Sequence, residues 1–190
     1  MRKILIPLIF LFNHLLFAQV ESNLDRINLL INKTCNEIND TIKHSAIINF
    51  QAPSNLYFLK NRAEVNFNQF YNKNNLLPDT LNFTLEAAGI NYNKIIKNGF
   101  FGDYLVERTA FIKGTYLLKQ NDKILIAKEF NKSVTDSVNY EDINKIENYS
   151  LPFTKGKLPD EPIASSIIEP LIAITASVVT VILFFTVRSK

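Results

Sequence analysis

The sequence predicts an α+β fold in which two amphipathic helices pack on a mainly antiparallel sheet of about four strands, followed by a single transmembrane helix at the C-terminus. Three observations lead to this prediction. Apolar residues recur at spacings of three and four in the first part of the chain, and they alternate with polar residues further on. Residues 171–187 contain no charged side chain.

Residues 1–18 have the composition of a secretory signal peptide. Arg2 and Lys3 precede an apolar run, and Ala18 is the small residue expected before a cleavage site. The alternative is an uncleaved anchor, which would more often contain a longer apolar run. The end of the signal, residues 16–19, resembles that of exported proteins from Bacteroidota. We therefore expect a bacterial protein that is exported.

Residues 164–187 are predicted to form the transmembrane helix. At about 1.5 Å per residue, the charge-free stretch 171–187 covers roughly 25 Å, close to the ~30 Å hydrocarbon core of a bilayer. Arg188 and Lys190 lie in the short tail 188–190, which the positive-inside rule assigns to the cytoplasm. This topology predicts a single-pass protein of the inner membrane with its N-terminal domain in the periplasm.

Small residues in the predicted span form two pairs with a spacing of four, Ala173 with Ser177 and Ala176 with Thr180. Such pairs allow two helices to approach closely. They predict transmembrane packing and leave a homo-oligomer open, although the same residue types are common in any span.

Residues 19–148 are predicted to form the exported domain, beginning with two helices. The first, at about 22–44, has an apolar stripe consisting of Leu24, Ile27, Ile31, Cys35, Ile38 and Ile42. The second follows Ser54 and has a stripe consisting of Leu56, Leu59, Ala63, Phe67 and Phe70. Residues 46–50 between them are predicted to be a short strand.

The second half of the domain is predicted to be mainly strands. Residues 81–87 alternate, Gly89 is expected to interrupt the strand, and a long strand at 104–119 turns into another at 124–134. A short helix at about 140–147 follows. The order of the elements resembles the small α+β domains of periplasmic envelope-assembly lipoproteins, such as curli-secretion and penicillin-binding-protein-activator types. The proline-containing stretch 149–163 is predicted to be a linker.

Cys35 and His44 are the first pair that nucleophilic chemistry would suggest. Nine positions apart on one helix, at about 100° per residue, they point in opposite directions. Cys35 also belongs to the apolar stripe, so we interpret it as a core residue. Glu37, Asp40 and His44 share a helix face and could hold a metal, but a solvent-exposed face has the same spacing. No metal site is predicted.

Asp103, Glu107 and Arg108 follow a glycine-containing loop, where catalytic groups often lie. Arg108 falls on the more apolar face of its strand, so it needs either an ion-pair partner or access to solvent. A hydrolase would require Asp103 or Glu107 to lie beside His44. The sequence contains no phosphate-binding glycine loop, nucleophile elbow or zinc-protease motif. We therefore predict no enzyme and no cofactor.

The charge and cysteine content limit the function further. Of the 21 basic residues, four lie at the chain ends, which leaves seventeen against eighteen acidic residues in the exported region. This balance gives no basic surface for nucleic acid. Cys35 is the only cysteine, so no internal disulfide can form.

The predicted function is that of a non-catalytic, membrane-tethered envelope protein whose periplasmic domain binds another envelope component, as an assembly, scaffold or secretion accessory. The predicted partners are membrane lipid, through the C-terminal helix, and an envelope protein. The alternative is a carrier anchored in the inner membrane, with a lipid or small apolar ligand between the helices and the sheet.

Overall fold

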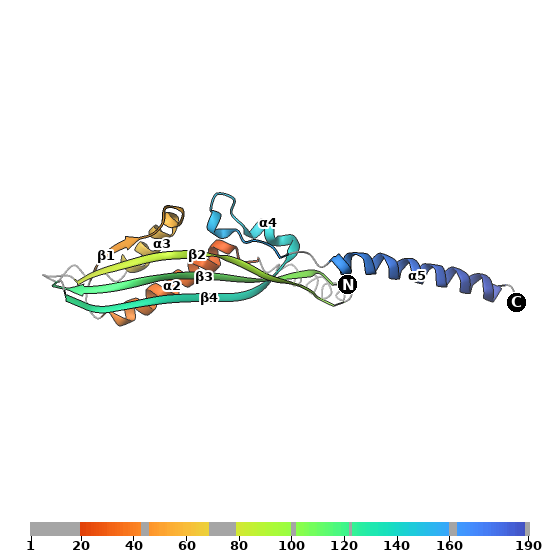
Figure 1. Ribbon diagram of the computed structural model, residues 1–190, viewed down its shortest axis with the longest axis horizontal. Coiled ribbons are helices and arrows are strands. Elements are labelled where there is room, and N and C mark those ends of the chain that lie inside the picture. The colour runs from red at the N-terminus through yellow and green to blue at the C-terminus, as the bar shows by residue number, and fades with distance from the viewer. Residues whose placement is uncertain are drawn as a thin grey trace, which may run out of the picture. The chain divides into compact units, whose positions relative to one another are not determined.

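A computed structural model describes residues 20–42, 46–68, 79–99, 102–121, 123–159 and 163–188. The chain divides into two compact units, Met1–Lys157 and Leu158–Lys190. The first contains a four-stranded mixed sheet, and the second contains helix α5 (Ile163–Arg188) (Figure 1). The predicted α+β class is therefore confirmed for the first unit. The predicted signal peptide lies outside the described residues.

The sheet has the strand order β1-β2-β3-β4. Strands β2 (Asp79–Lys97), β3 (Tyr104–Gln120) and β4 (Lys123–Asn139) form an antiparallel meander, whereas β1 (Ala46–Gln51) pairs in parallel with β2. Strands β2 and β4 extend further than predicted, whereas β3 matches its predicted range to within one residue. Gly89 does not interrupt β2, where it pairs with Phe111 and a Cβ atom would lie 3.1 Å from that ring. Because Gly89 has no side chain, the Phe111 ring can lie over β2 at this position.

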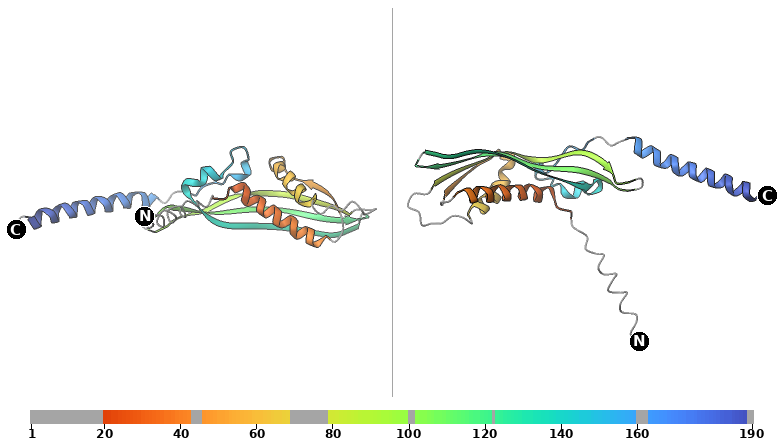
Figure 2. Two further views of the ribbon diagram at one scale, coloured as in Figure 1. Left: turned by 180° about the vertical axis from the view of Figure 1, so that it is seen from behind. Right: turned by 90° about the horizontal axis from the view of Figure 1, so that it is seen from below.

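Helices α2 (Asn23–Thr41) and α3 (Tyr57–Asn68) both contact the sheet, and they cover the same face (Figure 2). Ser22 begins α2 with a capping box, in which its side chain accepts a hydrogen bond from the Asp25 backbone. The turn η1 (Ser54–Leu56) precedes α3. Both helices and the short strand were predicted, although α2 ends at Thr41 rather than near residue 44.

Aromatic rings fill the space between the sheet and the helices. The Phe83 ring stacks on Phe50 at 5.4 Å and on Phe130 at 5.2 Å, and Phe67 of α3 meets it edge-on at 5.6 Å between centroids. The Phe130 ring reaches Phe83 by lying over Gly114, where an added Cβ would be 2.6 Å from Phe130 Cζ. Because Gly114 of β3 has no side chain, the Phe130 ring of β4 can lie over it and pack against Phe83 of β2.

The first part of the predicted linker belongs to the folded domain. Turns η2 (Tyr140–Asp142) and η3 (Pro152–Thr154) flank the short helix α4 (Ile143–Ile146), and η3 packs against β2. Phe153 and Thr154 are buried. Residues 149–157 belong to the first unit, which extends to Lys157. Pro152 begins the 3-10 helix η3, because proline is tolerated in the first turn of a helix.

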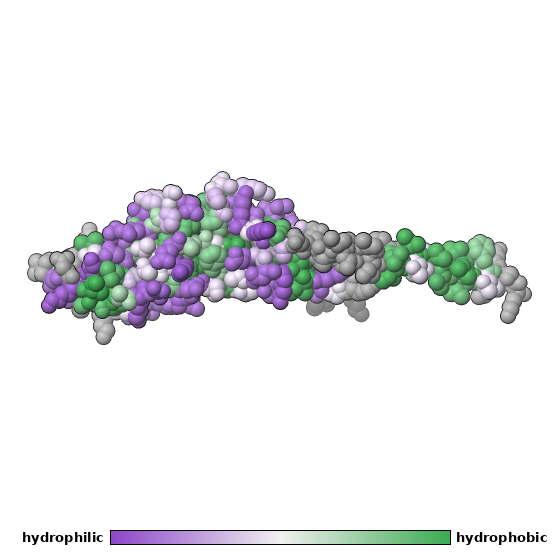
Figure 3. All heavy atoms as spheres, viewed as in Figure 1, coloured by the Kyte–Doolittle hydropathy of each residue, from purple (hydrophilic) through white to green (hydrophobic). Residues whose placement is uncertain are grey.

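Helix α5 is present at the predicted place, and its side chains from 171 to 186 are exposed. Figure 3 shows that this helix is covered by apolar side chains. Within the described residues, no helix combines the length and the apolar character needed to cross a membrane. The predicted helix at 164–187 thus exists, whereas its crossing of a membrane is not shown.

Substitution of Gly114 tests the aromatic packing. Gly114→Ala would place a Cβ 2.1 Å from the backbone oxygen of Thr84 as well as against Phe130, so the strands must shift. We expect the free energy of unfolding to fall by about 2 kcal/mol or more. The measurement is urea unfolding of the detergent-solubilised chain, with the exposed neighbour Lys113→Ala as control. Equal stability of the two variants would contradict this account.

Candidate functional site

A buried polar cluster lies where the start of α2 meets β3 and β4. Arg108 is 1% exposed and donates from Nε and Nη2 to the two carboxylate oxygens of Asp136, at 2.8 and 2.6 Å. Its Nη1 donates to the Asn23 side-chain oxygen and to the Glu21 carbonyl, both at 2.9 Å. Arg26 approaches the same Asp136 carboxylate at 2.8 Å. The predicted need of Arg108 for an ion-pair partner is confirmed.

The cluster continues through Asn23 to the docked segment. The Asn23 amide donates to the Tyr92 hydroxyl at 2.9 Å and to the Thr154 carbonyl at 2.7 Å. Tyr92 in turn donates to a Glu147 carboxylate oxygen, which also accepts from the Gly156 backbone at 3.1 Å. These bonds join the beginning and the end of the domain, so we interpret the cluster as structural.

Two pKa shifts follow from this arrangement. Desolvation raises the pKa of the Asp136 carboxyl, but the hydrogen bonds and charge of Arg108, helped by Arg26, outweigh it and hold that pKa below its usual range. Burial raises the pKa of Tyr92 to about 12, and the charge of Glu147 acts in the same direction. Both residues therefore keep one protonation state near neutral pH.

The structure separates the three residues predicted near the glycine-containing loop. Arg108 faces the helices, whereas its neighbour Glu107 faces the other side of the sheet, because successive strand residues alternate. Glu107 accepts from Asn93 at 3.1 Å and lies 3.2 Å from Lys94, and these contacts lower its pKa. Asp103 is exposed beyond the start of β3, in an acidic depression of about 290 Å³. These residues form no joint site.

Cys35 is fully buried, and burial raises its pKa to about 12, as suits the predicted core residue. Glu37 lies 2.7 Å from Lys132 of β4. His44, which the sequence suggested neither as a partner of Cys35 nor as a metal ligand with Glu37 and Asp40, lies outside the described residues. No group of three metal-ligating side chains occurs within the part of the chain that the structure describes.

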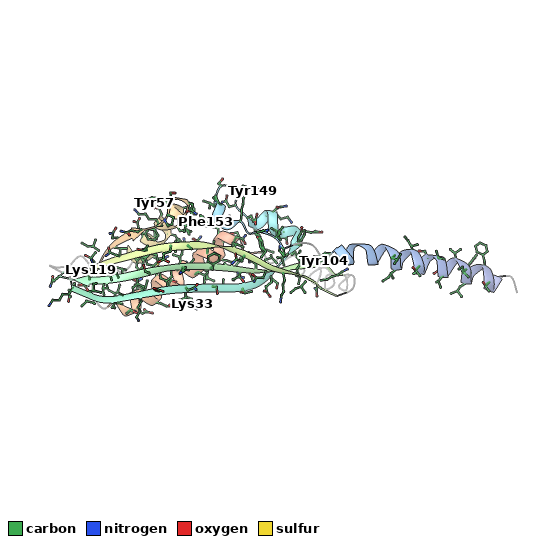
Figure 4. All side chains as sticks on the ribbon, in the orientation of Figure 1. Lys33, Tyr57, Tyr104, Lys119, Tyr149 and Phe153 are labelled. Atoms are coloured by element: carbon green, nitrogen blue, oxygen red, sulfur yellow. The ribbon has the colours of Figure 1, made fainter. Side chains whose placement is uncertain are left out.

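The sheet face away from α2 and α3 has no helix over it in the described domain (Figure 2). Figure 3 views this open face, which is mostly polar with an apolar patch at one end. That end is the β3–β4 hairpin, marked by Lys119 in Figure 4, where Ile124 and Leu125 are 61% and 51% exposed. Tyr104 marks the opposite end of β3.

A groove of about 660 Å³ crosses the open face near the hairpin. Two rows of residues, each containing one residue from every strand, form most of its lining, and the pair Tyr116 and Lys128 of β3 and β4 completes it. The strand registers give these rows as Asn49, Asn82, Leu117 and Ala127, and as Gln51, Thr84, Thr115 and Glu129. Alternation along each strand was visible in the sequence, but only the register brings the rows together.

Strand β4 forms one edge of the sheet, and β3 is its strand partner in the described structure. Its 17 residues therefore present a row of backbone N–H and C=O groups on the outer side. On the open face of β4, Asn131, Ser133 and Thr135 are exposed. This edge is the longest surface in the described domain on which another strand could pair.

In α5, the four hydroxyl residues between 171 and 186 all donate to the carbonyl four positions earlier. Ser177 donates to Ala173 and Thr180 to Ala176, both at 2.8 Å. Thr175 and Thr186 make the same bond to residues 171 and 182, at 2.7 and 2.8 Å. The predicted small-residue positions thus lie one above the other along the helix.

No protein-family model matches this chain, and no curated protein matches it in sequence. Among solved structures, the crystal structure of the rare lipoprotein B from Shewanella oneidensis has a remote similarity. Its sequence identity is 10%, the match covers 66% of this chain and 80% of that chain, and the TM-score is 0.27. A similarity of this size assigns no function.

Substitution of Asp136 tests the buried cluster. At neutral pH, Asp136→Asn should lower the free energy of unfolding by about 3 kcal/mol, because it leaves the Arg108 charge buried without a counter-ion. The folded pKa of Asp136 lies below the unfolded value of about 3.9, so the carboxylate stabilises the fold above that pH. This contribution is lost as the pH falls through the folded pKa.

Urea unfolding at several pH values should therefore show the wild type and the Asp136→Asn variant converging in stability below about pH 4. Glu107→Gln is the matched control, because it removes an exposed carboxylate next to Arg108 at a cost of at most about 1 kcal/mol. A pH-independent difference between Asp136→Asn and wild type would contradict the assigned ion pair.

Proposed function

We propose that this chain is a non-catalytic binding module of the bacterial cell envelope, held at the inner membrane by α5, which binds an envelope protein through the free edge of β4. The observation that carries the proposal is the 17-residue edge strand with β3 as its partner. An extended segment of another protein can add to such an edge by main-chain hydrogen bonds, while side-chain positions along the edge supply specificity.

The side chains of β4 favour pairing with a specific partner strand over non-specific aggregation. Lys123 and Lys128 are exposed, and Lys132 extends toward Glu37 of α2. Lysines on an edge discourage pairing with a hydrophobic strand of the wrong partner. The exposed Ile124 and Leu125 beside them give an incoming strand an apolar contact at the hairpin end. A partner segment that combines acidic and apolar residues would suit this edge.

The proposed membrane attachment rests on α5. Residues 171–187 contain no charge, and the hydroxyls between 171 and 186 bond within the helix. Internal satisfaction of polar groups is what a hydrocarbon environment requires. Folding of residues 149–157 onto the domain leaves residues 158–162 between the domain and α5. The proposed spacer is therefore five residues long.

The alternative of a lipid carrier has no observation in its favour. The region between the helices and the sheet, where a lipid was expected, contains the stacked rings around Phe83. The two hollows described above lie elsewhere, on the open face and beside Asp103, and polar residues line both.

Photo-crosslinking in cells tests the proposed edge. A photoreactive residue at Asn131 or Thr135 of β4 should capture the same protein, because both positions lie along the free edge. Lys113 is the matched control, since it is exposed and pairs with Asn131 from the central strand β3. Binding of the purified partner should also slow hydrogen exchange at alternate amides of β4, as strand addition requires. Equal capture from Lys113, or unchanged exchange in β4, would refute strand addition.

Extraction from membranes tests the proposed anchor. The full chain should stay with the membrane after an alkaline carbonate wash, and deletion of residues 164–190 should release the domain. Ser177→Arg places a charge in the middle of α5 at a cost of about 3 kcal/mol and should weaken insertion, whereas the control Ser177→Leu should not. Release of the full chain by carbonate would contradict a transmembrane anchor.

A further inference from the structure

Residues of all four strands line the groove on the open face. The groove is separate from the outer edge of β4, which the proposed function uses. Thr84 and Thr115 are paired across the two central strands, and Asn82 and Leu117 form the neighbouring pair. The side chains of two successive rows thus form a hollow of about 660 Å³, within the ordinary range of about 300–1,000 Å³ for small-ligand sites. Its size suits a short segment of a chain molecule lying across the strands.

Amides and hydroxyls dominate the lining. The Asn49 amide donates to the Asn82 side-chain oxygen at 3.2 Å. This bond fixes two neighbouring carboxamides and leaves the Asn49 oxygen as an acceptor, with the second Asn49 N–H and both Asn82 N–H groups as donors. Gln51 adds a third carboxamide, and Thr84 and Thr115 add hydroxyls that both donate and accept. The groove therefore offers mixed donors and acceptors over its whole width.

The charge of the lining excludes strongly ionic ligands. Glu129 is the one charged residue of the two rows, and the adjacent Lys128, of opposite sign, also borders the groove. A nucleic acid or another polyanion would need a basic surplus, which this lining lacks. The aliphatic contribution is small, from Leu117 and Ala127. It suits the C–H surface of a sugar ring better than an acyl chain or a large apolar side chain.

We propose that this groove binds a neutral, hydroxyl-rich chain, that is, an oligosaccharide segment of the envelope. Sugar hydroxyls donate and accept at once, which matches carboxamides and threonines that do the same. A peptide is the less suitable occupant, because peptide recognition uses either a free strand edge or pockets for anchoring side chains. The groove floor consists of the paired strands β2 and β3, whose side chains there are Asn82, Thr84, Thr115 and Leu117. The site is independent of the proposed protein-binding edge.

Ligand-observed NMR on the full chain, in a detergent without a sugar headgroup, tests the proposal. The probes are triacetylchitotriose and maltotriose, with an unstructured neutral peptide of similar mass for comparison. We expect saturable binding of at least one sugar with a Kd in the millimolar range, typical of a few exposed hydrogen bonds. The variants Asn82→Ala and Thr115→Val should each weaken that binding by about threefold to tenfold.

Asn91→Ala is the matched control, because Asn91 is exposed on the same face of β2 outside the groove and pairs with Thr109. It should leave sugar binding unchanged. Circular dichroism spectra and thermal midpoints equal to those of the wild type would show that the two groove variants are folded. Absence of saturable sugar binding, binding of the peptide alone, or sugar binding unaffected by both groove variants would each overturn the proposal. None of these outcomes bears on crosslinking at the β4 edge.

Discussion

The buried guanidinium of Arg108 is the constraint on which the rest of the domain depends. An ionised group at 1% exposure is tolerated only when its charge and its N–H groups are all matched, and each of its donor nitrogens has a partner. Those partners come from β4 and from the start of α2. The same Asn23 that accepts from Arg108 donates to the Thr154 carbonyl, so one charge fixes the positions of a helix, two strands and the last segment of the domain.

One face of the sheet is buried against the helices, and this burial limits where a binding surface can lie. The side chains that face the helices form the polar cluster and the aromatic stack around Phe83. Because successive strand residues alternate, every second side chain of β2, β3 and β4 falls on a face that no helix of the described domain covers. Binding surfaces are therefore expected on this face and along the outer edge of β4.

The sequence predicted local structure well and long-range contacts poorly, for physical reasons. The stripe around Cys35 and the alternation after Leu81 reflect periods of 3.6 and 2, which a single chain displays. The need of Arg108 for a partner was visible too. Its actual partners Asp136 and Asn23 stand 28 and 85 positions away, and nothing in the local pattern selects them. The groove depends on the register of three strand pairs, which no single strand encodes.

Residues 149–157, which the sequence predicts to be part of a linker, show the same dependence on contacts that the local pattern does not reveal. Prolines made the segment appear unstructured, yet Phe153 is buried and the Thr154 side chain bonds to Asn148. Apart from the short 3-10 helix η3, the segment is ordered by contacts with the rest of the domain, such as the bond from Asn23 to the Thr154 carbonyl. Residues 158–162, the part that remains between the domain and α5, reach at most about 17 Å when extended, against about 50 Å for the predicted linker. A spacer of five residues would limit how far the domain can move from the start of α5.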